Sequence, residues 1–141
     1  MLQNMIKTAA EATGLTQAKA REAIGIVFNT SERQGSALAE VIFQKMPGAR
    51  TLSATTGADL GAATGVIARL IEQTPGGRRH IGEAMFSALH TAGLGHSEIA
   101  KLLPTIGQYM RVTYGLEEFA HIGDLVVGEA IPGQTKAAAA A

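Results

Sequence analysis

The segment Thr13-Gly14-Leu15-Thr16-Gln17 decides how the first part of this chain folds. Glycine readily adopts the left-handed conformation that ends a helix, and threonine is a favoured N-cap for the next one. The segment therefore predicts two helices joined by a short turn. A second segment of the same order, Ala92-Gly93-Leu94-Gly95-His96-Ser97, predicts another helical pair later in the chain, with Ser97 as the cap.

Apolar residues recur every three or four positions along most of the chain, which is the spacing of amphipathic helices. Helices are expected over about 2–12 and from Thr16 onward, and Ser31-Glu32-Arg33-Gln34 has the spacing of a capping box for the next helix. Pro47 and Pro75, each followed by glycine, should each end a helix. The pattern predicts an all-α fold of six or seven short helices, packed as successive helical hairpins.

Residues 49–57 are rich in Thr, Ser and Ala, and we expect a loop there. The helix after it is predicted over about 58–73, and three more over about 78–92, 97–110 and 116–130. In the 58–73 helix the expected buried residues are Leu60, Val66, Ile67, Leu70 and Ile71.

A chain of 141 residues fits one domain, which we place at residues 1–132. The Ala-rich residues 133–141 lack an apolar anchor and are expected to form a flexible tail. Superposing Gly14 on Gly93 places Gly25 on Pro104, so both second helices carry a poor helix former at the same place. An internal duplication would explain this, although any two amphipathic helices can be matched in this way.

The composition excludes several classes of function. Twelve basic residues balance twelve acidic ones, so the net charge gives no attraction for nucleic acid or anionic lipid. The absence of cysteine removes disulfides, thiol catalysis and thiolate metal sites. No apolar run reaches the roughly 18 residues that a membrane span needs, and the N-terminus has no signal-peptide pattern. We expect a cytoplasmic protein without a membrane partner, unless a presequence has been removed.

Gly57, Gly61 and Gly65 are spaced four apart, so on one helix they would form a smooth stripe. Each glycine inside a helix costs about 1 kcal/mol relative to alanine, which suggests a steric reason for three of them. The stripe predicts a close helix contact, either within the chain or between two copies.

Histidine is the residue type left for metal ligation or acid–base catalysis. His80, His90, His96 and His121 are scattered, and no two are four apart. A metal site needs three or four convergent ligands, and the sequence offers no compact set of them. We therefore predict no catalytic residue, no metal and no cofactor, while a site assembled from distant residues would include His96, Glu98 or His121.

Two further groups of residues have both a functional and a structural interpretation. Gly76-Gly77-Arg78-Arg79 lies at a predicted helix start, where free amides and two arginines could hold an anion. The alternative is an exposed charged turn. Tyr109, Arg111 and Tyr114 could form a stacking patch, or could cover a core edge with the hydroxyls in water.

Two resemblances to known families accompany these patterns. The run Ala9-Ala10-Glu11-Ala12-Thr13-Gly14-Leu15-Thr16-Gln17-Ala18-Lys19-Ala20 resembles the N-terminal helical hairpin of bacterial histone-like nucleoid proteins, but the sheet and basic arm of that family do not follow. A longer stretch, within residues 5–115, resembles the VcgC/VcgE-type bacterial domain of unknown function, which implies a short helical fold and supplies no catalytic residues. That second resemblance is carried by Gly14-Leu15-Thr16, Phe43-Gln44-Lys45-Met46-Pro47-Gly48-Ala49, Met85-Phe86-Ser87-Ala88-Leu89, Leu102-Leu103-Pro104 and Gln108-Tyr109.

The sequence favours a small, non-enzymatic interaction or assembly protein that associates with itself, as a homo-oligomer, or with another protein. One alternative is a carrier of a small apolar ligand in an inter-helix pocket, because Met5, Met46, Met85 and Met110 could line an adaptable cavity. A weaker alternative is a nucleoid-type DNA-binding protein.

Overall fold

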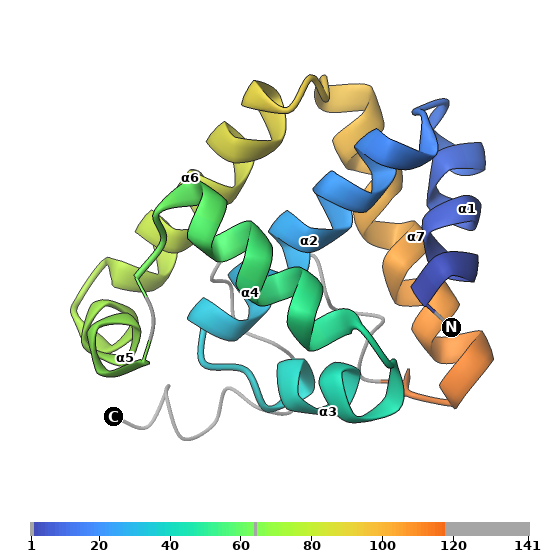
Figure 1. Cartoon of the computed structure of the whole chain (residues 1–141). Helices are drawn as coiled ribbons and strands as arrows, with labels where there is room; N and C mark the ends of the chain where they lie inside the picture. The colour runs from blue at the N-terminus through green and yellow to red at the C-terminus, as the bar shows by residue number, and fades with distance from the viewer. Residues whose placement is uncertain (1, 64, 118–141) are drawn as a thin grey trace.

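The computed structural model describes residues 2–63 and 65–117, and within these ranges it contains seven helices and no strand (Figure 1). The expectation of an all-α fold is confirmed. The helices are α1 (Leu2–Thr13), α2 (Gln17–Arg33), α3 (Ala37–Lys45), α4 (Ala49–Leu60), α5 (Gly65–Gln73), α6 (Gly77–Thr91) and α7 (His96–Tyr114).

Helix α2 is the centre of the fold. Every residue from Ala23 to Ser31 is buried, because α1, α3, α4, α5 and α6 all pack against this helix. Two of these buried residues carry a hydroxyl group, and each hydroxyl donates a hydrogen bond to a carbonyl of the same helix. Thr30 Oγ1 donates to the Ile26 carbonyl at 2.8 Å, and Ser31 Oγ donates to the Val27 carbonyl at 3.0 Å. A helix buried on all sides can therefore carry polar residues.

The first and last described helices, α1 and α7, pack along one another (Figure 1). The main core lies between these helices and α2, α3, α4 and α6. Its largest fully buried side chains include Met5, Ile6, Ile24, Phe28, Ile42, Met46, Met85, Leu89 and Leu102.

The turn residues behave as the sequence indicates. Gly14 and Gly93 both have positive φ, 78° and 104°, and the Thr16 hydroxyl accepts a hydrogen bond from the Lys19 amide at 3.1 Å as an N-cap. Helix α3 ends just before Pro47 and α5 just before Pro75, so the prediction for both prolines is confirmed.

The predicted loop at residues 49–57 is wrong, because these residues form most of α4. Leu52, Ser53 and Thr56 are buried against α2, and the Ser53 hydroxyl donates to Glu32 Oε1 at 3.1 Å. Tertiary contacts of this kind override the low helix propensity of Thr and Ser.

The predicted helix over 58–73 is also wrong, because the chain breaks into two helices there. Gly61 ends α4 with φ 67°, and Gly65 begins α5 with φ 57°. Both values lie in the left-handed region, which is incompatible with a continuous right-handed helix.

Two predicted caps lie elsewhere. Ser31 is inside α2, which continues to Arg33, and Ser36 is the actual cap of α3: its hydroxyl accepts from the Leu38 amide at 3.0 Å. At α7 the N-cap is Gly95 rather than Ser97, and Glu98 Oε1 accepts from the Gly95 amide at 2.7 Å. In each case the helix boundary is shifted by a few residues from the sequence signal.

The predicted helix over 116–130, apart from Leu116 and Glu117, and the tail at 133–141 lie outside the described residues. Leu116 packs against the main core. None of the seven helices combines the length and the hydrophobicity that a membrane span would need.

Candidate functional site

An exposed apolar ridge runs along α5, the helix at one end of the molecule (Figure 1). Val66, Ile67 and Leu70 are 74%, 58% and 56% exposed, and we call them the α5 ridge. Leu60, at the end of α4, is also exposed. Their predicted burial is wrong because α5 is only nine residues long and contacts α6 and α2 through its other side, where Ala68 is buried and Ile71 half-buried.

An apolar groove of about 550 Å³ lies between α1 and α7. The two helices that form this α1–α7 groove lie at the other end of the molecule from α5 (Figure 1). Val112 is 73% exposed at its edge. None of its lining residues is charged: they are Thr8, Ala12, Pro104, Thr105, Gln108, Tyr109, Val112 and Thr113.

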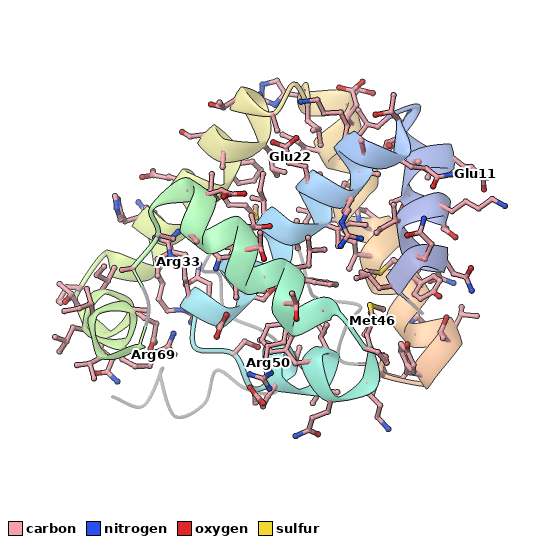
Figure 2. The ribbon with its side chains drawn as sticks, in the orientation of Figure 1. Glu11, Glu22, Arg33, Met46, Arg50 and Arg69 are labelled. Carbon is pink, nitrogen blue, oxygen red and sulfur yellow. The ribbon has the colours of Figure 1, made fainter. Side chains whose placement is uncertain are left out.

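A third feature is a polar cavity of about 510 Å³, which we call the α2–α5 cavity. The end of α2 forms one wall, the turn into α3 and the start of α3 a second, and α5 the third. Figure 2 shows Arg33 and Arg69 on this side of the molecule. The lining residues are Asn29, Glu32, Arg33, Gly35, Ser36, Ala39, Glu40, Ala63, Gly65, Val66, Ala68 and Arg69.

Among the four charged side chains of this cavity, Arg69 and the two glutamates already have partners. Arg69 Nη2 donates to the carbonyls of Glu32 and Arg33, at 2.7 and 3.0 Å, and so caps the C-terminus of α2. Glu40 pairs with Arg50, and Glu32 accepts from Ser53.

Arg33 is the exception. Its guanidinium makes no hydrogen bond or ion pair with any residue in 2–63 or 65–117. The side chain is half-buried, and this burial lowers the pKa of Arg33 from its ordinary value.

Asn29 is the most buried polar residue of the cavity, at 3% exposed. Its Nδ2 donates to the Ser53 carbonyl at 3.3 Å, while its Oδ1 accepts no hydrogen bond within the described part of the chain. Neither Asn29 nor Arg33 is among the site residues that the sequence pattern predicts. The available signal was the polar run Asn29-Thr30-Ser31, which directly follows the apolar stretch Ile24–Phe28.

The three predicted stripe glycines do not share a helix face. A Cβ on Gly57 would stand 2.5 Å from Asn29 Nδ2, so this glycine does lie in a close contact, between α4 and α2. Gly61 and Gly65 have open space where a Cβ would be, and they bend the backbone instead. The second glycine of the close contact is Gly25 of α2, where a Cβ would collide with the Thr56 hydroxyl and crowd Leu52.

The predicted anion site at Gly76, Gly77, Arg78 and Arg79 is partly occupied by the chain itself. The Gly77 amide donates to the Thr74 carbonyl at 2.8 Å. Arg78 and Gln34 form two hydrogen bonds. Gln34 Nε2 donates to the Arg78 carbonyl at 2.9 Å, and Arg78 Nε donates to Gln34 Oε1 at 3.4 Å. Arg78 is half-buried, whereas Arg79 is exposed.

Two of the four histidines meet. The rings of His90 and His96 lie edge to face with centroids 5.2 Å apart, and His90 Nδ1 is 2.9 Å from the Leu94 carbonyl. Glu98 caps Gly95 instead of joining them, His80 is exposed on α6, and His121 lies outside the described residues. Within 2–63 and 65–117 no three His, Asp or Glu side chains gather closely enough to hold a metal ion.

The aromatic and methionine candidates contribute to the core. Tyr109 and Tyr114 pack against its edge. Arg111 bonds to Gln108 at 3.1 Å and pairs with Glu117 at 3.2 Å. Met5, Met46, Met85 and Met110 are fully buried in the core, and none of them lines the α1–α7 groove or the α2–α5 cavity.

No protein-family model, no curated protein and no solved structure matches the chain. The resemblance to the VcgC/VcgE-type domain therefore stays a prediction.

Proposed function

We propose that this chain is a self-assembling helical protein whose α5 ridge inserts into the α1–α7 groove of a second copy. The observation that carries this proposal is the presence of an exposed apolar ridge and an uncharged apolar groove on the same chain. Large exposed aliphatic side chains in a row are typical of an interaction surface.

The two surfaces suit each other chemically. The ridge consists of three branched aliphatic side chains, and the groove offers the methyl groups, proline ring and aliphatic atoms of residues such as Ala12, Pro104 and Val112. Because neither surface carries a charge, no ion would have to be desolvated when they meet. The balanced net charge of the chain also gives two copies no mutual repulsion.

The position of the surfaces determines the kind of assembly. A ridge and a groove at opposite ends of one molecule give a head-to-tail contact, in which every copy uses one surface of each kind. Such contacts form open chains or rings rather than closed two-fold dimers. The ridge is small, so we expect a weak contact with a dissociation constant between micromolar and millimolar.

Sedimentation of the whole chain from about 10 μM to about 1 mM tests the proposal, because this range spans the expected dissociation constant. The average mass should rise with concentration. Ile67→Glu in the ridge and Ala12→Glu in the groove should each abolish the rise, whereas Ser87→Glu, at an exposed site on α6 away from both surfaces, should leave it intact.

Mixing the two variants separates the head-to-tail contact from its rival. Ile67→Glu keeps an intact groove and Ala12→Glu an intact ridge, so an equal mixture should form dimers and nothing larger. If Ala12→Glu alone associates as the wild type does, the contact is ridge to ridge and the proposed groove is wrong. A wild type that stays monomeric at the highest concentration would overturn the proposal altogether.

A further inference from the structure

We propose that the α2–α5 cavity is a binding site for a small organic molecule with a single carboxylate and an N–H or O–H donor, such as a short aliphatic amino acid or hydroxy acid. In this site Arg33 holds the anionic group and Asn29 accepts a hydrogen bond from the donor.

Arg33 supplies the anion-binding group because, of the four charged side chains of the cavity, it is the one that pairs with no described residue. The other cation, Arg69, is fixed on two carbonyls of α2 and also lies 3.7 Å from Glu72. Burial penalises the charged form of Arg33, and no described residue compensates for this. A carboxylate would do so, since its two oxygens match the guanidinium fork.

Asn29 supplies the acceptor. A buried carbonyl oxygen without a donor is unfavourable, and in native proteins such groups are usually satisfied by water or a ligand. Its Nδ2 is already committed to the Ser53 carbonyl, which fixes the orientation of the amide and leaves Oδ1 as the free atom. An ammonium, amide or hydroxyl group of a ligand would satisfy it.

The remaining walls limit the charge and size of the ligand. Glu32 and Glu40 also line the cavity, so a group with several negative charges, such as a nucleotide phosphate, would be repelled. Ala39, Val66 and Ala68 offer an apolar surface for a short alkyl chain. A volume of about 510 Å³ is within the range of small-molecule sites.

The test is a titration of the full-length ¹⁵N-labelled chain, followed by the amide resonances of Gly35 and Ser36 and the side-chain amide of Asn29. L-valine has both required groups, L-valinol lacks the carboxylate, isovalerate lacks the donor, and 2-hydroxyisovalerate keeps a hydroxyl donor. Valine, 2-hydroxyisovalerate or both should give saturable shifts below about 20 mM. Valinol and isovalerate should bind at least about tenfold more weakly, because each loses one hydrogen-bonding group.

Arg33→Gln tests the residue directly. It should weaken binding by about tenfold or more without loss of fold, since the Arg33 guanidinium has no partner among the described residues. Arg21→Gln is the matched control, an exposed arginine on the same helix, and should bind as the wild type does. Asn29 is tested by changing the ligand, because its substitution would also remove the bond to Ser53.

Three results would overturn the site. These are no saturable shift with any of the four compounds, equal binding of valine and valinol, or unchanged binding by Arg33→Gln. None of them bears on self-assembly, which is tested at Ile67 and Ala12. Inorganic phosphate completes the series, and binding of phosphate in preference to valine would contradict a site for an organic carboxylate.

Discussion

The backbone of Gly57 in α4 lies directly against the side-chain amide of Asn29 in α2. A Cβ at position 57 would stand 2.5 Å from Asn29 Nδ2, closer than real Cβ contacts come. The absence of a side chain on Gly57 therefore lets the amide reach the Ser53 carbonyl at 3.3 Å. One glycine thus contributes both to the packing of α4 on α2 and to the position of a polar group in the α2–α5 cavity.

Gly57→Ala should destabilise the protein by up to about 2 kcal/mol, measured as the free energy of unfolding in urea. Alanine gains about 1 kcal/mol of helix propensity over glycine, but the added methyl group displaces Asn29 and overpacks the α2–α4 contact, which costs about 1–3 kcal/mol or more. The two effects have opposite signs, and the measured sign shows which is larger.

Ala58→Gly is the control for this experiment. Ala58 is exposed on the same helix, so this change reports the propensity difference alone, about 1 kcal/mol of destabilisation. If Gly57→Ala stabilises the protein by a similar amount, the contact with Asn29 is not tight.

Leu70→Ala should change the free energy of unfolding of the monomer by no more than about 0.5 kcal/mol, because Leu70 is 56% exposed. Leu89→Ala in α6 removes the same atoms from a fully buried site and should cost about 2–5 kcal/mol. Both variants are measured at low concentration, where self-association does not contribute. A large loss for Leu70→Ala would mean that this residue is buried, as its spacing in the sequence indicates.

Tyr114 should titrate above its ordinary value, because burial raises its pKa and the neighbouring Tyr109 raises it further. The folded state then favours the neutral phenol, so this contribution to stability is complete below about pH 10 and is lost as the pH rises further. Tyrosinate absorbance gives the titration directly, since the chain has two tyrosines and no tryptophan.

Tyr114→Phe identifies the absorbance transition of Tyr114. The transition that is missing in this variant should be one that lies above pH 10 in the wild type. The same variant should lose less stability than the wild type between about pH 9 and pH 11, the interval that spans the tyrosine pKa. Titration of the missing group at or below pH 10 would contradict the expected effect of burial.

The parts of the fold that the sequence predicts are those fixed by local chemistry. Gly14 and Gly93 take the left-handed turn, Thr16 caps α2, and Pro47 and Pro75 follow the ends of α3 and α5. These outcomes depend on a few neighbouring residues, and they do not require knowledge of the partner helix.

The sequence pattern predicts the wrong structure where contacts with a neighbouring helix determine whether a segment is helical or buried. The Thr- and Ser-rich segment of α4 is helical because α2 covers it, and the apolar pattern of α5 is exposed because no described helix covers it. Periodicity reports that a face is apolar, and it does not report what lies against that face. The sequence pattern does not predict the α2–α5 cavity for the same reason, because the fold brings Asn29, Ser36 and Arg69 together from three separate helices and turns.

Arg69 is the residue that ties α5 to the rest of the fold, and its removal should loosen that helix selectively. Its guanidinium lies over Gly35, where a side chain would collide with it, and donates to the Glu32 and Arg33 carbonyls at the end of α2. The Glu32 carbonyl also accepts from the Gly35 amide at 3.0 Å, so Arg69 is not its sole donor. Hydrogen bonds from a charged group are among the stronger ones, about 1.5–3 kcal/mol each when buried and less at the partial exposure of Arg69. Arg69→Gln should therefore destabilise the protein by about 1–2 kcal/mol.

Hydrogen exchange locates the effect. In Arg69→Gln the amides of α5 should exchange faster, by roughly five- to thirtyfold for a local loss of that size, while the amides of α1 and α7 keep their protection. Arg79→Gln, an exposed arginine on α6, is the control and should leave the exchange of α5 unchanged. Unaltered α5 protection in Arg69→Gln would show that the contacts of Ala68 and Ile71 hold the helix by themselves, and that the two carbonyl bonds add little to its stability.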